Sequence, residues 1–78
     1  MITKMKYFKV IRHRTSPQSD YYIIEYHRAS ALVNVEMKID REKSLYGSNV
    51  FVKGKEVSKK EYTENRWFAG TYNKIPKL

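Results

Sequence analysis

Apolar residues occur in short runs along this chain, separated by polar segments with proline or glycine, and this pattern predicts several β-strands. Residues 5–14 and 21–28 are rich in aromatic and β-branched side chains, and the polar segment 15–20, broken by Pro17, separates them as a loop. Residues 31–40 alternate most regularly, because positions 33, 35, 37 and 39 are apolar and positions 34, 36, 38 and 40 are polar. We therefore expect three strands in the first forty residues.

The segment from residue 40 to residue 57 predicts a loop and then a hairpin. Residues 40–49 are charged and contain Gly47, so we expect a loop here, which can include a helical turn at residues 43–45. Residues 50–57 resume the strand pattern, and the Lys53-Gly54 pair in their middle favours a turn, although it is a weaker turn signal than Asn-Gly.

A helix is expected to follow, because Ser58 and Glu61 have the spacing of a capping box. Val57 and Tyr62 flank the box as a hydrophobic staple. The helix should reach residue 68 or 69 and end with Gly70 as its C′ residue, although residues 67–72 can instead form a last strand. Residues 71–78 contain a proline and are expected to fray.

These elements predict an α+β fold, an antiparallel β-meander of three to five strands with one C-terminal helix packed on one face. With 78 residues the chain is one small basic α+β domain, residues 1–78, with no room for a second. One short helix covers only one side of the sheet, so we expect four apolar residues to lie on an open second side. They are Phe8, Val10, Ile23 and Leu32. A small barrel, a homodimer or a partner surface would cover them.

Composition limits the remaining choices. There is no cysteine, which excludes disulfides and thiolate zinc sites. The longest apolar run, residues 21–24, is far shorter than the roughly 20 residues that span a bilayer. We expect a cytoplasmic protein that does not use a membrane. Net charge is +8, with residues 1–14 and 43–78 basic and residues 15–42 slightly acidic.

The basic first strand is threaded with aromatic residues, and that combination suits nucleic acid, since cations contact phosphates while rings stack on bases. Lysines on exposed strands can also serve only solubility and the blocking of sheet edges. The candidate binding residues for nucleic acid or an acidic protein surface are Lys6, Tyr7, Phe8, Lys9, Arg12, Arg14, Tyr21, Lys53, Lys55, Lys59 and Lys60. The sequence does not choose between DNA and RNA.

Catalytic chemistry has little support in the sequence. His13 and His27 lie near the loop ends of adjacent predicted strands, so an acid–base pair of a metal-independent ribonuclease is the one enzymatic option. The two histidines lack the spacing of a metal site, and the sequence has no glycine-rich loop that would indicate a nucleotide cofactor. Trp67 and Phe68 are expected to dock the helix in the core.

Two functional hypotheses follow. The first is a non-enzymatic nucleic-acid-binding module that uses a cationic, aromatic strand face. The alternative is a protein-binding inhibitor or adaptor, such as a small phage or mobile-element accessory protein that acts on a host protein complex through the open face.

Overall fold

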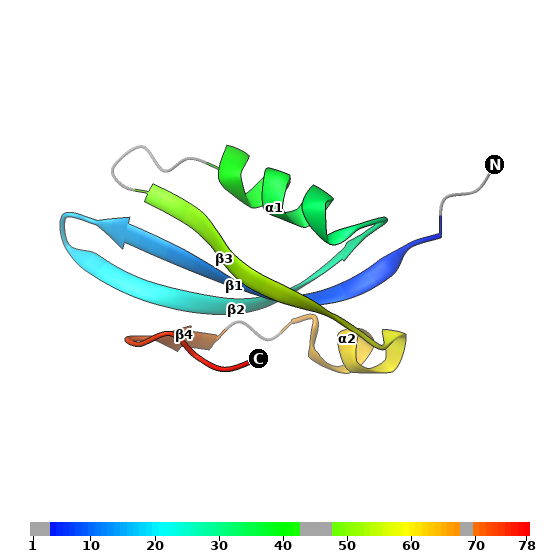
Figure 1. Ribbon diagram of the computed structural model, residues 1–78. Coiled ribbons are helices and arrows are strands. Elements are labelled where there is room, and N and C mark those ends of the chain that lie inside the picture. Colours follow the sequence, from blue (N-terminus) through cyan, green and yellow to red (C-terminus); the bar gives the residue numbers. More distant parts are fainter. Residues whose placement is uncertain (1–3, 43–47, 68–69) are drawn as a thin grey trace.

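The fold is a four-stranded antiparallel sheet with α1 on one side and α2 on the other (Figure 1). The computed structural model describes residues 4–42, 48–67 and 70–78. In chain order the elements are β1 (Lys6–Ser16), β2 (Ser19–Ala29), α1 (Leu32–Arg41), β3 (Ser48–Val57), α2 (Lys59–Asn65) and β4 (Gly70–Tyr72). The strands lie in the order β3-β1-β2-β4. The expected α+β class with an antiparallel sheet is confirmed, but this part of the chain has a second helix, so the single-helix prediction is wrong.

The β1–β2 hairpin is the longest paired unit, with a register that runs from Lys6 opposite Ala29 to Ser16 opposite Ser19. Pro17 and Gln18 alone form the turn, so the predicted loop over residues 15–20 is too long. The Ser16 hydroxyl fixes this turn by accepting a hydrogen bond from the Ser19 amide at 3.1 Å. Serine is favoured in turns because its side chain can bond neighbouring backbone amides in this way.

The predicted third strand, residues 31–40, is the helix α1, and this is the main correction to the sequence analysis. Leu32, Val35 and Ile39 have helical spacing as well as being apolar, and the helix turns all three toward the sheet. Val33 and Met37 belong to the same alternating set, yet they lie on the outer surface at 55% and 47% exposure. The alternation therefore arises because apolar residues of two separate rows on the helix fall on alternate positions. Val35 and Ile39 face the sheet, and Val33 and Met37 face outward.

The main core forms where α1 packs on β1. Phe8 and Val10, at 4% and 0% exposure, lie in one cluster with Val35 and Ile39, and Leu32 and Phe51 pack against it. The prediction that Phe8 and Val10 lie on an open face is wrong, because α1 covers that face. Ile11 and Ile24 are also buried, on the opposite side of the sheet. Both sides of the central hairpin are therefore covered.

β3 is one continuous strand rather than a hairpin, so the turn predicted at Lys53 and Gly54 is absent. A register shift at Ile11 and Arg12 lets Phe51 face α1 instead of the opposite side. Gly54 lies opposite Val10, and a Cβ atom on it would come within 2.8 Å of Val10 Cγ1. This glycine makes room for close packing rather than for a turn.

The predicted start of α2 is confirmed, since Ser58 is the N-cap and its hydroxyl accepts a hydrogen bond from the Glu61 amide at 3.0 Å. The helix ends at Asn65, earlier than expected. Gly70 begins β4 and pairs with Ile24, so its predicted role as a C′ residue is wrong and the alternative of a last strand is right for residues 70–72. The turn at residues 43–45 and the core position of Phe68 lie outside the described residues.

Candidate nucleic-acid interface

The strand register assigns every sheet residue to one of two sides. In an antiparallel pair, directly opposed residues point to the same side, and neighbours along a strand point to opposite sides. Phe8, Val10 and Arg12 therefore face α1, whereas Tyr7, Lys9 and Ile11 face away from it. The away-facing side also carries α2 and the C-terminal segment (Figure 1). We call these the α1 side and the α2 side.

Charge is distributed unequally between the two sides. Among the described residues, the α1 side has five basic residues, Lys6, Arg12, Arg14, Lys38 and Arg41, and five acidic ones, Glu25, Glu36, Asp40, Glu42 and Glu56. Among the described residues, the α2 side has seven basic residues on the strands, on α2 and at its C-cap, Lys9, Arg28, Lys53, Lys55, Lys59, Lys60 and Arg66, and three acidic ones, Asp20, Glu61 and Glu64. The C-terminal segment, residues 73–78, runs along this side in Figure 1 and brings two more lysines, Lys74 and Lys77, which makes nine. Lys4 precedes β1 and belongs to neither side. The α1 side is therefore neutral, and the excess positive charge lies on the α2 side.

Lysines meet across two strands at the centre of the α2 side. Lys9 on β1 lies directly opposite Lys55 on β3, and Lys53 lies opposite Ile11. Lys53 and Lys55 are exposed. In the described ranges the ion pairs involve Arg12, His13 and His27, and no lysine is within ion-pair distance of a carboxylate. The Lys9 ammonium lies 6.0 Å from the centre of the Tyr26 ring, whereas Lys53 and Lys55 have no such contact among the described residues and can contact an external anion.

The tyrosines on the α2 side are mostly engaged with other side chains. Tyr7 packs on Tyr62 of α2 with ring centroids 4.8 Å apart, and Tyr22 stacks on the His13 ring at 4.4 Å. The Tyr26 hydroxyl donates a hydrogen bond to Glu61 at 3.3 Å, and burial together with the Glu61 carboxylate raises the pKa of Tyr26. The contacts of Tyr7 and Tyr26 join α2 to the sheet, and that of Tyr22 joins β2 to β1, so the three rings are structural.

The α1 side contains an ion-pair network around Arg12. Its guanidinium donates hydrogen bonds to Glu25 at 2.7 Å and to Glu42 at 2.6 Å, and the side chain is 11% exposed. Burial alone would lower the pKa of Arg12, but the two carboxylates outweigh it and raise the pKa. For Glu25, burial would raise the pKa, but hydrogen bonds from His27 and Arg12 and the charge of Arg12 lower it. Arg12 is thus part of the fold and is not available to a phosphate.

The predicted binding residues are therefore split between the two sides. Lys6, Phe8, Arg12, Arg14 and Tyr21 lie on the α1 side, where Phe8 is too deeply buried to stack on a base. Lys9, Lys53, Lys55, Lys59 and Lys60 share the α2 side with Tyr7. The sequence of β1 is rich in basic residues, but they are divided between two opposite sides of the sheet, so one ligand would not contact all of them.

The two histidines also lie on opposite sides, because His13 is opposite Tyr22 and His27 is opposite Phe8. His13 contacts Asp20, and His27 contacts Glu25 at 2.5 Å. The acid–base pair that a ribonuclease mechanism requires is therefore not assembled. No group of three or more metal-ligating side chains occurs within residues 4–42, 48–67 and 70–78.

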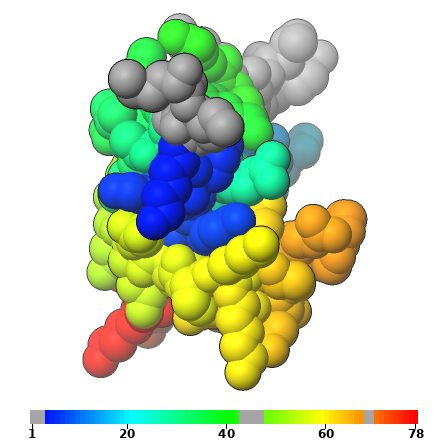
Figure 2. Space-filling model, turned by 90° about the vertical axis from the view of Figure 1, so that its right-hand side faces the viewer, coloured from blue at the N-terminus to red at the C-terminus, as the bar shows by residue number. Residues whose placement is uncertain are grey.

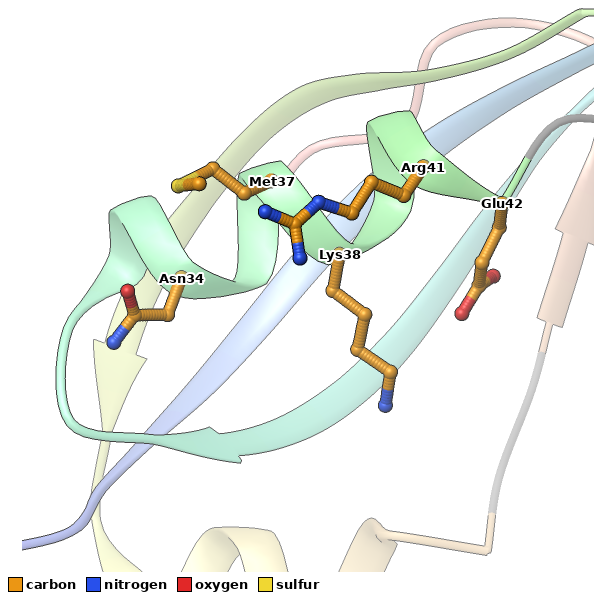
Figure 3. A pocket seen from close by; sticks show the side chains of 5 residues that line it. All are labelled: Asn34, Met37, Lys38, Arg41 and Glu42. Atoms are coloured by element: carbon orange, nitrogen blue, oxygen red, sulfur yellow. The ribbon is translucent and has the colours of Figure 1, made fainter.

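A surface depression lies on the outer surface of α1, with a volume of about 360 Å³. Its walls are Asn34, Met37, Lys38, Arg41 and Glu42 (Figure 3). All five come from α1 and the residue after it, so within the described residues the depression is formed by one helix without an opposing wall. The carboxylate of Glu42 is already bound to Arg12.

Comparison of the chain with protein-family models, curated proteins and solved structures gave no significant match. Neither α1 nor α2, the two helices in the described part of the chain, has the length and apolar character needed to cross a membrane. The arguments about function therefore rest on the geometry of the two sides.

Four basic residues of the α2 side were missed as binding candidates, namely Arg28, Arg66, Lys74 and Lys77. The only available signal was the positive charge of residues 43–78 taken together. Trp67 was expected in the core, but it is 83% exposed, so that prediction is wrong. The helix that was to carry it inward ends two residues before it.

Proposed function

We propose that this protein is a non-enzymatic nucleic-acid-binding module that uses its α2 side. The observation that carries the proposal is the sorting of charge, because the described residues put nine basic and three acidic side chains on one side and equal numbers of each sign on the other. Lysines placed for solubility alone would be spread over both sides, since either would keep the protein dissolved. A one-sided excess matches the elongated negative charge of a phosphate backbone.

The placement of Lys9 and Lys55 supports the proposal further. Like charges directly opposite each other on adjacent strands are destabilising, so this pair weakens the sheet. Lys59 and Lys60 occupy the first turn of α2, where cations oppose the helix dipole. Both placements cost folding free energy that an anionic ligand would recover. Since lysine contacts phosphate as a flexible point charge, we expect binding that is insensitive to base sequence.

The test is a charge-reversal pair. Lys53→Glu with Lys55→Glu changes the α2 side, and Lys38→Glu with Arg41→Glu makes the same change in net charge on the α1 side. Binding of labelled DNA and RNA oligonucleotides is measured by fluorescence anisotropy across a salt series. Each phosphate contact contributes about 0.7 to 0.9 to the slope of log K against log salt, so the α2-side variant, which loses two lysines, should lose about 1.4 to 1.8 in slope. The α1-side variant should bind like the wild type.

Equal weakening by both variants would show that net charge alone attracts the nucleic acid, and the proposed interface would be wrong. Absence of wild-type binding at low salt would remove the function altogether. Circular dichroism of each variant controls for loss of fold.

A protein-binding inhibitor or adaptor is the second candidate, and it now rests on different residues. The face of Phe8 and Val10 on which it was based is buried, whereas Val33 and Met37 leave apolar surface on α1. A protein partner or a second copy would therefore contact α1. Met37→Asp should abolish a nuclease-resistant complex in a pull-down, and an unchanged complex would count against this candidate.

A further inference from the structure

The most exposed large apolar side chain among the described residues is Trp67, at 83%. It is the only tryptophan in the chain and follows directly after α2, whose C-cap is Arg66. The Arg66 guanidinium carbon lies 4.6 Å from the centre of the indole ring. A tryptophan is normally buried over much of its large surface, so an indole held in solvent beside a cation requires an explanation.

We infer that Trp67 and Arg66 form a base-stacking platform for single-stranded nucleic acid. This inference rests on the proposed function and narrows its ligand class. In a duplex the bases stack on one another and their faces are not accessible, whereas a single strand can turn a base onto an aromatic ring. Stacking requires only a π face and accepts every base, so it suits a site whose other contacts are lysine to phosphate.

The position of Trp67 allows stacking and phosphate contacts at the same time. Lys60 lies in the first turn of α2, and a helical rise of 1.5 Å per residue puts Asn65, the last residue of the helix, about 8 Å further along its axis, with Trp67 two residues later. A short stretch of single strand can bridge that separation. Figure 2 shows the chain after α2, in orange, projecting beside α2, in yellow, in the half of the molecule away from α1. A ligand could therefore reach both ends of the helix.

The other aromatic rings of the α2 side are less suited to this role. Tyr7 is packed on Tyr62 and Tyr22 is stacked on His13, so binding a base would break existing contacts. Arg66 occupies at most one face of the indole, and the high exposure of Trp67 leaves ring surface open. Arg66 can also add a cation–π or phosphate contact once a base is bound.

The single tryptophan makes the test direct, because its emission reports on this site alone. Wild-type protein is titrated with oligo-dT, oligo-U and a DNA duplex of equal length, while anisotropy of the labelled strand gives the affinity. We expect quenching of Trp67 by both single strands, or by one of them, and weaker binding of the duplex. Trp67→Ala should weaken single-strand binding roughly 5- to 150-fold with an unchanged salt slope. Trp67→Phe, which keeps a stacking ring, should retain most of the affinity.

The outcomes separate the inference from the function beneath it. If the wild type binds with the expected salt slope but its emission is unchanged, or Trp67→Ala binds single strands as tightly as the wild type, the platform is wrong and the lysine interface stands. Preference for the duplex would also overturn the platform. If no oligonucleotide binds the wild type, the proposed function fails and the inference fails with it.

Discussion

Gly54→Ala provides the sharpest test of the packing between α1 and the sheet. A Cβ atom at this position would lie 2.8 Å from Val10 Cγ1, 3.0 Å from Leu32 Cδ1 and 3.4 Å from the Lys9 carbonyl oxygen. The Leu32 methyl can rotate away. Val10 of β1 is fully buried and β-branched, so its methyl is fixed and β3 must shift away from β1. No described glycine has a positive φ, which leaves this contact as the reason for glycine.

The expected cost follows from these contacts. Forcing one methyl group into a filled core costs about 1–3 kcal/mol, and replacing glycine by alanine recovers about 0.4–1 kcal/mol by restricting the unfolded chain. We therefore expect a net loss of about 1–2 kcal/mol in the free energy of unfolding, measured by urea denaturation with far-UV circular dichroism. Tryptophan emission is a poor probe here, because Trp67 is already exposed.

A double-mutant cycle with Val10→Ala tests the cause. Val10→Ala alone should destabilise by about 2 kcal/mol through lost burial and a cavity, but it also removes the methyl that obstructs the new side chain in Gly54→Ala. The double variant should therefore be more stable than the sum of the two losses by at least about 0.5 kcal/mol. A Gly54→Ala variant as stable as the wild type, or strictly additive losses, would refute the close approach of Gly54 on β3 to Val10 on β1.

Two further predictions concern α2 and the Arg12 network. Ser58→Ala should cost about 1 kcal/mol in thermal denaturation by removing the N-cap hydrogen bond, whereas Ser58→Asp should lose little, and equal losses would exclude capping as the cause. Because the folded-state pKa of Glu25 is lowered, its ionisation stabilises the fold above the ordinary carboxyl pKa of 4.5, and that stability is lost as pH falls further. In Glu25→Gln the midpoint of urea denaturation should depend less on pH in this acidic range. In Glu64→Gln, at an exposed site, the midpoint should have the same pH dependence as in the wild type.

The elements predicted correctly were those defined by local chemistry. The β1–β2 hairpin follows from two strand-like runs around a proline, and the start of α2 follows from the side chain of Ser58. The start of α1 carries no such signal, because its N-cap is Ala31, whose side chain makes no hydrogen bond. Neither end of α1 has a glycine or a proline, so the spacing of its apolar residues was the remaining sequence evidence for its secondary structure.

That period is ambiguous over ten residues, and a distant contact decides it. As a strand, residues 31–40 would bury Val33 and Met37 but leave Phe8 and Val10 uncovered. As a helix, they expose Val33 and Met37 and cover the larger pair together with Phe51. Burying the aromatic side chains recovers more apolar area, so tertiary packing overrides the local pattern.

The formation of a helix rather than a strand by residues 31–40 also determines where a ligand can bind. Once α1 covers Phe8 and Val10, Arg12 on that side lies between Glu25 and Glu42 and its charge is neutralised within the fold. The excess of cations lies on the other side, which no count along the sequence could show, because a register shift of one residue would exchange the two sides. By covering Phe8, α1 removes the aromatic surface that was predicted on β1. The lysines of the α2 side then remain as the available electrostatic site, and an aromatic contact must come from outside the sheet, where Trp67 lies.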